Sequence, residues 1–113
     1  MKNQLTKEQS QHLIDLGVPK EKASDKISYG FLGYDPIFRL TDLLAILPKE
    51  IAHSKFYMIG NGEEWEVGYC HYNGEELYPS SDLDFKAFKT KEELIDSLYE
   101  LCVFCLKNGY LKF

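Results

Sequence analysis

The residues best placed to do chemistry are two cysteines, Cys102 and Cys105, in a C-x-x-C spacing. That spacing occurs in structural zinc sites and in redox centres. Both cysteines fall near the middle of the apolar arc of a predicted helix, where a thiol behaves as a small hydrophobic side chain and burial disfavours the thiolate. We predict that both are buried and metal-free. A zinc site is the alternative, and its other ligands would come from Cys70, His71, His12 and His53.

The acidic clusters do not predict a carboxylate site. Glu63, Glu64 and Glu66 lie at one end of a predicted hairpin, and Glu75 and Glu76 lie near the other. A strand between them separates the two groups by roughly 25 Å, which is too far for a shared substrate or metal. A further pair, Asp82-x-Asp84, has no third ligand. Solvent-exposed hairpin ends explain these residues.

No nucleophile stands beside a base. Cys70 and His71 are adjacent on a predicted strand, so their side chains point to opposite faces and cannot form a dyad. His12 and His53 are isolated, and the sequence contains no G-x-S-x-G, Walker, H-E-x-x-H or dinucleotide-binding motif. We therefore predict a protein that is not an enzyme and has no cofactor.

The aromatic residues are the remaining candidates. The chain holds eight Tyr, seven Phe and one Trp, and aromatic rings on an open sheet face recur at interaction surfaces. Ordinary cross-strand pairing is the alternative explanation. Two rings in a loop are expected to be exposed and to extend such a surface. The predicted partner surface consists of Tyr29, Tyr34, Tyr57, Trp65, Tyr69, Tyr72 and Tyr78.

The element that positions the rest is a helix predicted over residues 90–109. Thr90 and Glu93 have the spacing of a capping box, and Asn108-Gly109 is a helix stop. The apolar residues between them fall on one broad arc. We expect a sheet to pack against this helix.

The sheet is predicted as an antiparallel meander. Its strands are Lys55–Gly60, Trp65–Tyr72, Glu75–Tyr78 and, less strongly, Leu83–Phe88. Asn61-Gly62 predicts a two-residue type I′ turn, and Asn73-Gly74 predicts a second hairpin. Helices followed by a run of strands and a final helix indicate an α+β fold with helices on one face of the sheet.

Residues 1–26 are expected to form a helical arm that docks lightly on a core of residues 27–113 within one domain. Thr6 and Gln9 cap its first helix, and Gly17 ends it. A second piece over residues 19–26 also allows a helix-turn-helix interpretation. A net charge of −5 opposes binding to a nucleic-acid backbone.

Residues 27–38 are predicted to be an ordered clasp rather than a linker, because they are rich in Tyr, Phe, Ile and Leu. Ile27, Phe31, Ile37 and Phe38 are expected to join the core. A short helix over residues 43–47 should follow, capped by Thr41 and Asp42 and ended by Pro48.

The N-terminal residues, the apolar runs and the cysteine count indicate the cellular compartment. The first residues, MKNQLTKEQSQ, contain no apolar segment of a signal peptide, and no apolar run is long enough to span a membrane. Three cysteines, an odd number, suit reduced thiols better than disulfides. We expect a cytoplasmic protein that does not bind membranes.

Three segments resemble a family of small uncharacterised proteins found in bacterial mobile elements and prophage-like regions. They are LIDLGVP (13–19), FRLTDLLAILPKEI (38–51) and EELIDSLYEL…KNGYL (92–111). The resemblance implies a cytoplasmic accessory protein and supplies no site residues.

The sequence therefore predicts an α+β domain with a three- to four-stranded meander, packed on one face by a long C-terminal helix and a short helix. The predicted function is non-enzymatic contact with a protein partner, or with a second copy as a homodimer. The alternative is a nucleic-acid-binding accessory factor that uses the N-terminal arm.

Overall fold

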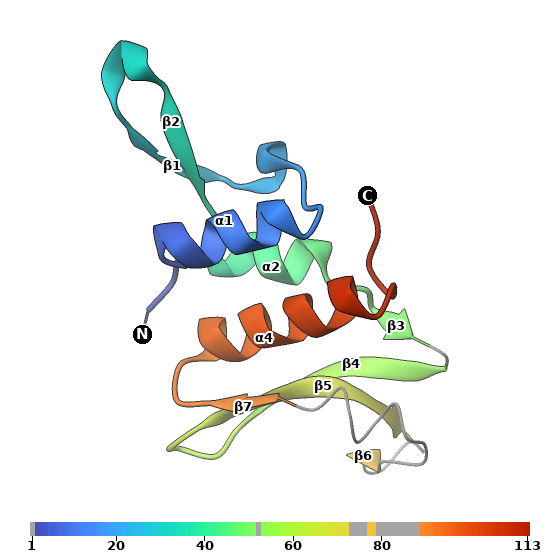
Figure 1. The fold of residues 1–113 in the computed structure, drawn as a ribbon. Helices are drawn as coiled ribbons and strands as arrows, with labels where there is room; N and C mark the ends of the chain where they lie inside the picture. Colours follow the sequence, from blue (N-terminus) through green and yellow to red (C-terminus); the bar gives the residue numbers. More distant parts are fainter. Residues whose placement is uncertain (1, 52, 73–76, 79–88) are drawn as a thin grey trace.

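The computed structural model describes residues 2–51, 53–72, 77–78 and 89–113. Its helices are α1 (Lys7–Asp15), α2 (Leu40–Ile46) and α4 (Leu94–Lys107), with short 3-10 turns η1 (Lys20–Lys22) and η2 (Gly30–Leu32). Its strands are β1 (Asp25–Ser28), β2 (Tyr34–Ile37), β3 (Glu50–Ile51), β4 (Ser54–Gly60), β5 (Trp65–Tyr72), β6 (Leu77–Tyr78) and β7 (Lys89–Lys91). Helix α4 lies between the sheet and the pair α1 and α2 (Figure 1). This confirms the predicted α+β fold.

The main sheet is built around β5. Strand β4 pairs with it antiparallel from Lys55↔Cys70 to Gly60↔Trp65, and β3 pairs with the start of β4. On the other side of β5, β7 pairs with its beginning and β6 with its end. The central hairpin is therefore confirmed, whereas Asn73-Gly74 and Leu83–Phe88 lie outside the described residues. Strand β7 was not predicted, because Lys-Thr-Lys carries no apolar signal.

Helix α4 supplies the largest share of the core. Its buried apolar residues are Leu94, Ile95, Leu98, Leu101, Cys102 and Cys105. The helix ends at Asn108 and Gly109 as predicted, with Gly109 at φ +76°. The predicted capping box is wrong. Thr90 lies in β7, paired with Glu66, and α4 begins only at Leu94. Thr90 could have capped the helix, but it pairs with β5 as part of a strand instead.

The N-terminal residues belong to the core rather than to a lightly docked arm. Leu5, Leu13 and Val18 are buried in the same cluster as α4. The capping box is confirmed, since Gln9 N donates to Thr6 Oγ1 (3.1 Å) and Thr6 N donates to Gln9 Oε1 (3.0 Å). After α1 the chain makes the single turn η1 and no second α-helix before β1. A helix-turn-helix is therefore not formed in residues 7–28.

Helix α2 starts earlier than predicted, at Leu40 instead of Leu43. The carboxylate of Asp42 accepts hydrogen bonds from the backbone N–H groups of Arg39 (2.8 Å) and Ser24 (2.9 Å). This places Asp42 inside the first turn, where a carboxylate stabilises a helix. The helix ends before Pro48, as predicted.

Residues 25–37 form a hairpin that projects from the body of the molecule (Figure 1). Ile37 and Phe38 are buried at its base, as predicted. The prediction that Ile27 and Phe31 join the core is wrong, because Ile27 is 41% exposed and Phe31 is 102% exposed. The antiparallel pairing carries Ile27 and Phe31 away from the core cluster.

The turn between β4 and β5 spans residues 61–64, so the predicted two-residue turn is also wrong. Asn61 does not have a positive φ, whereas Gly62 does (+94°). The side-chain Oδ1 of Asn61 accepts hydrogen bonds from the backbone N–H of Glu63 (2.9 Å) and of Glu64 (2.7 Å). The asparagine side chain thus organises a wider loop.

We expect Asn61→Ala to lower the free energy of unfolding by about 1 kcal/mol, because two backbone N–H groups lose their acceptor. Glu63→Gln should have little effect, since its backbone N–H is unchanged. Urea unfolding followed by circular dichroism measures both. Equal stability of the two variants would show that the asparagine side chain does not hold this turn.

Candidate functional site

The predicted aromatic sheet face is not assembled as one surface. Trp65 and Tyr69 alternate with Val67 on the side of β5 that faces α4, and Tyr69 is fully buried. The hydroxyl of Tyr69 donates to the carbonyl oxygen of Pro48 (2.6 Å). Tyr69 therefore cannot contact a partner, and that part of the prediction is wrong. Trp65 is partly buried against the core.

The other tyrosines of the predicted sheet surface do not form an aromatic face with Trp65 and Tyr69 in the described residues. Tyr57 lies on the opposite side of the sheet from Tyr69, because it pairs with Gly68 while Phe56 pairs with Tyr69. It is half-buried and donates its hydroxyl to Glu66 Oε2 (2.8 Å). The side chains of Tyr72 and Tyr78 lie outside what the structure describes.

The two loop tyrosines lie where the sequence predicted. Tyr29 is 44% exposed and Tyr34 is 48% exposed, at the outer end of the projecting hairpin. Between them, η2 carries the two residues that sequence reasoning missed as contact residues, Phe31 and Leu32, the latter 80% exposed. We call Tyr29, Phe31, Leu32 and Tyr34 the hairpin tip. The sequence feature that could have identified them is the pair of glycines, Gly30 and Gly33, on either side of Phe31-Leu32. Both glycines have positive φ, as residues of a sharp turn often do.

Hydrogen bonds and an ion pair hold the backbone and Tyr29 of the hairpin tip. Tyr29 N donates to Gly33 O (2.9 Å), and Gly33 N donates to Gly30 O (3.2 Å). The hydroxyl of Tyr29 donates to Asp35 Oδ2 (2.7 Å), which is also 3.3 Å from Lys7 Nζ of α1. The Tyr29 hydroxyl and then Lys7 hold the pKa of Asp35 below its ordinary value. These contacts link the tip to α1.

The edges of the hairpin are protected near its base. The Tyr29–Gly33 hydrogen bond sets the alternation of the ladder, so the backbone groups of Lys26 and Ser28 on β1 and of Tyr34 and Pro36 on β2 point outward. Pro36 has no N–H to donate. The Lys26 N–H already donates to Asp25 Oδ1 (2.8 Å). Such devices discourage strand addition at the base of the hairpin.

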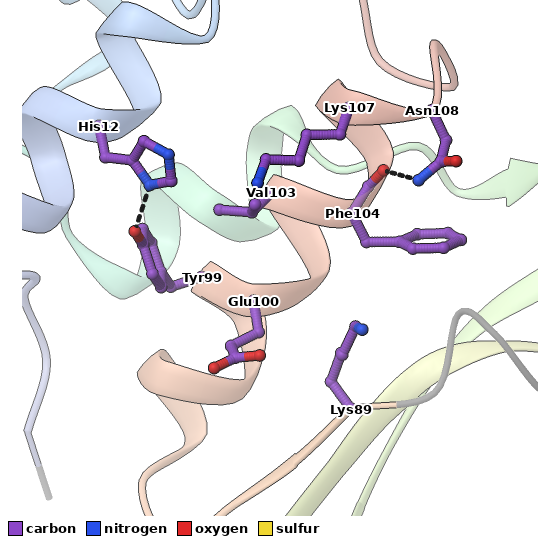
Figure 2. A pocket seen from close by; sticks show the side chains of 8 residues that line it. All are labelled: His12, Lys89, Tyr99, Glu100, Val103, Phe104, Lys107 and Asn108. Atoms are coloured by element: carbon purple, nitrogen blue, oxygen red, sulfur yellow. Dashed lines mark hydrogen bonds between the residues drawn. The ribbon is translucent and has the colours of Figure 1, made fainter.

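A second candidate is a hollow of about 380 Å³ between α1, α4 and β7. Figure 2 shows His12 turned toward Tyr99, and Nδ1 of His12 lies 2.6 Å from the Tyr99 hydroxyl. Burial, followed by Glu100, raises the pKa of Tyr99. Glu100 pairs with Lys91 (3.3 Å), and Lys89 Nζ lies 5.3 Å from the centre of the Phe104 ring.

This hollow holds no nucleophile beside its histidine. The described residues that line it include no thiol or aliphatic hydroxyl that His12 could activate; they are His12, Lys89, Tyr99, Glu100, Val103, Phe104, Lys107 and Asn108. The His12–Tyr99 hydrogen bond instead joins α1 to α4. Glu100 makes its ion pair with a lysine outside the hollow.

Cys102 and Cys105 are fully buried, as predicted. Burial raises the pKa of both thiols, that of Cys105 to about 11. Cys70 is buried as well. Within the described residues no three His, Cys, Asp or Glu side chains form a group that could hold a metal. The absence of bound zinc stays a prediction.

No helix in the described part of the chain is long and apolar enough to cross a membrane. Comparisons with family models, curated proteins and solved structures find no match to this chain. The resemblance to accessory proteins of mobile elements therefore stays a prediction.

The buried thiols predict a loss of stability at high pH. The pKa of Cys105 rises from about 9 to about 11 on folding, so its contribution is complete below pH 9 and is lost as the pH rises toward 11. A shift of this size corresponds to about 3 kcal/mol. We expect the free energy of unfolding to fall over this range, with a shallower slope in Cys105→Ala. Identical slopes, measured by urea unfolding at each pH, would contradict this.

Asp35→Asn should loosen the hairpin without loosening the core. The folded pKa of Asp35 is lowered, so its contribution is present at neutral pH and is lost as the pH falls below about 4. Hydrogen exchange at pH 7 should show faster exchange of amides in residues 26–34 of the variant, with α4 unchanged. Glu21→Gln is the control, and hairpin protection equal to the control would show that this carboxylate does not hold the hairpin.

Proposed function

We propose that this protein is a non-enzymatic interaction protein that contacts another protein, or a second copy of itself, through the hairpin tip. The observation that carries the proposal is the exposure of Phe31 (102%) and Leu32 (80%) at the end of an ordered hairpin. A large apolar side chain in water adds nothing to the stability of the free chain. Burying each one against a partner would contribute about 1.5–3 kcal/mol.

The order of the tip supports the same proposal. A flexible apolar loop loses conformational entropy when it binds, whereas a preorganised one has already met that cost. Tyr29 is fixed by Asp35, and Lys7 of α1 lies 5.7 Å from the centre of the Tyr29 ring. The contact rings and the two apolar side chains are therefore presented together before any partner arrives.

The rival functions have weaker support. A nucleic-acid-binding arm would use a recognition helix, and η1 is a single 3-10 turn. An enzyme would use the hollow, where His12 faces no nucleophile. A cytoplasmic accessory role fits the thiols of Cys102 and Cys105, which form no disulfide and which a reducing compartment would preserve.

A photo-cross-linking residue tests the proposal. We expect p-benzoylphenylalanine at position 31 to form a light-dependent protein adduct in an extract of the native host. The same residue at position 59 is the control, since Ile59 is also exposed (47%) but lies at the far end of β4. Excess unlabelled wild-type protein should suppress the adduct, and the Phe31→Ser/Leu32→Ser variant should not. No adduct at position 31, or equal suppression by both competitors, would overturn the proposal.

A further inference from the structure

Three lysines surround the hairpin tip. Lys26 Nζ and Lys20 Nζ lie 5.1 and 5.8 Å from the centre of the Tyr34 ring, and Lys7 Nζ lies 5.7 Å from that of Tyr29. Each contact is within the range of a cation–π interaction. We call Lys7, Lys20 and Lys26 the lysine collar. Lys26 pairs with Pro36, two residues toward the base of the hairpin from the Ser28–Tyr34 pair.

The collar is a positive feature on an acidic chain. The net formal charge of the protein is −5. Among the ion pairs of the described residues, Lys7 is paired with Asp35 (3.3 Å), and no pair includes Lys20 or Lys26. The neighbouring carboxylate of Asp25 is paired with Arg39 (3.0 Å). Two ammonium groups beside the tip are thus held by aromatic faces and left available to an external carboxylate.

The shape of the tip defines how a partner can meet it. An end-on approach brings the two most exposed apolar side chains of the hairpin, Phe31 and Leu32, to the partner first. Phe31 and Leu32 then form a narrow convex wedge, whose complement is a concave apolar pocket. The collar would reach the mouth of that pocket when the wedge is inserted.

We propose, on the basis of the proposed function, that the partner is a protein with an apolar pocket whose rim carries aspartate or glutamate side chains. Phe31 and Leu32 fill the pocket, and Lys20 and Lys26 pair with the rim. The apolar contact supplies most of the affinity. The rim charges supply orientation, rate of association and sensitivity to salt.

An anionic lipid surface is the less favoured occupant. Two apolar side chains make only a small anchor, and stable attachment to a membrane takes a second signal. A polybasic patch could be that signal, but the net charge of −5 opposes approach to an anionic bilayer. Vesicle binding is therefore an outcome that would overturn the inference.

The experiment uses the protein that the position-31 adduct identifies by mass spectrometry, expressed and purified. Affinities are measured by calorimetry at 50 mM and 500 mM NaCl. We expect Phe31→Ser/Leu32→Ser to weaken binding about 100-fold at both salt concentrations. Lys20→Gln/Lys26→Gln spares the Lys7–Asp35 pair and should weaken binding about 3- to 10-fold at low salt only.

Lys55→Gln/Lys107→Gln is the matched control, since it removes the same charge from exposed positions on β4 and α4. If it weakens binding as much as the collar variant does, the acidic rim is wrong, while loss of binding in the tip variant keeps the proposed function. If the tip variant binds like the wild type, or no protein adduct forms, the proposed function itself fails.

Two other outcomes would overturn the inference about the partner. One is an adduct only with a second copy of this chain. The other is tip-dependent co-sedimentation with phosphatidylcholine–phosphatidylglycerol (3:1) vesicles.

Discussion

The burial of one face of α4 is the constraint on which the rest of the structure depends. Leu98 and Leu101 are completely covered, with the sheet on one side and α1 and α2 on the other. Two polar groups drawn into this contact are hydrogen-bonded. Ser97 Oγ donates to the Trp65 carbonyl (2.9 Å), and the Tyr69 hydroxyl donates to that of Pro48 (2.6 Å). Because this core is complete without residues 27–34, the hairpin is free to carry apolar side chains that it does not bury.

Features set by local periodicity could be predicted from the sequence. The apolar arc of α4, the two long strands and the capping box of Thr6 and Gln9 all follow from side-chain spacing. Features set by contacts between distant segments could not. Thr90 and Glu93 have a capping pattern, yet pairing with β5 draws Thr90 into a strand. Asn61-Gly62 has a tight-turn pattern, yet the asparagine side chain bonds the backbone of a wider loop. At Thr90 a contact between distant segments decides the outcome. At Asn61 two local arrangements compete, and the sequence pattern alone does not say which one forms.

The candidate site shows the same division. Exposure of Tyr29 and Tyr34 could be predicted, because rings close together in a loop cannot all turn inward. The burial of Phe31 was predicted from composition, and composition does not say whether any element lies within reach. The prediction of an aromatic sheet face was wrong for a geometric reason. Side chains alternate along β5, and this places Trp65 and Tyr69 on the side that faces α4. Counting aromatic residues gave no information about which face each ring occupies.

The direction of the hairpin is set by the core rather than by the hairpin itself. Strand β2 continues into Phe38, which is fully buried, and its backbone N–H donates to the buried Ser10 Oγ of α1 (3.1 Å). The Phe38 carbonyl accepts from Leu5 N (2.9 Å). Helix α1 is in turn bound to α4 through His12 and Tyr99, and it also supplies Lys7 to the hairpin. The tip is thus joined to α4 by a continuous chain of packed and hydrogen-bonded groups. A partner that engages it would meet a stalk with a defined orientation, not a tethered loop.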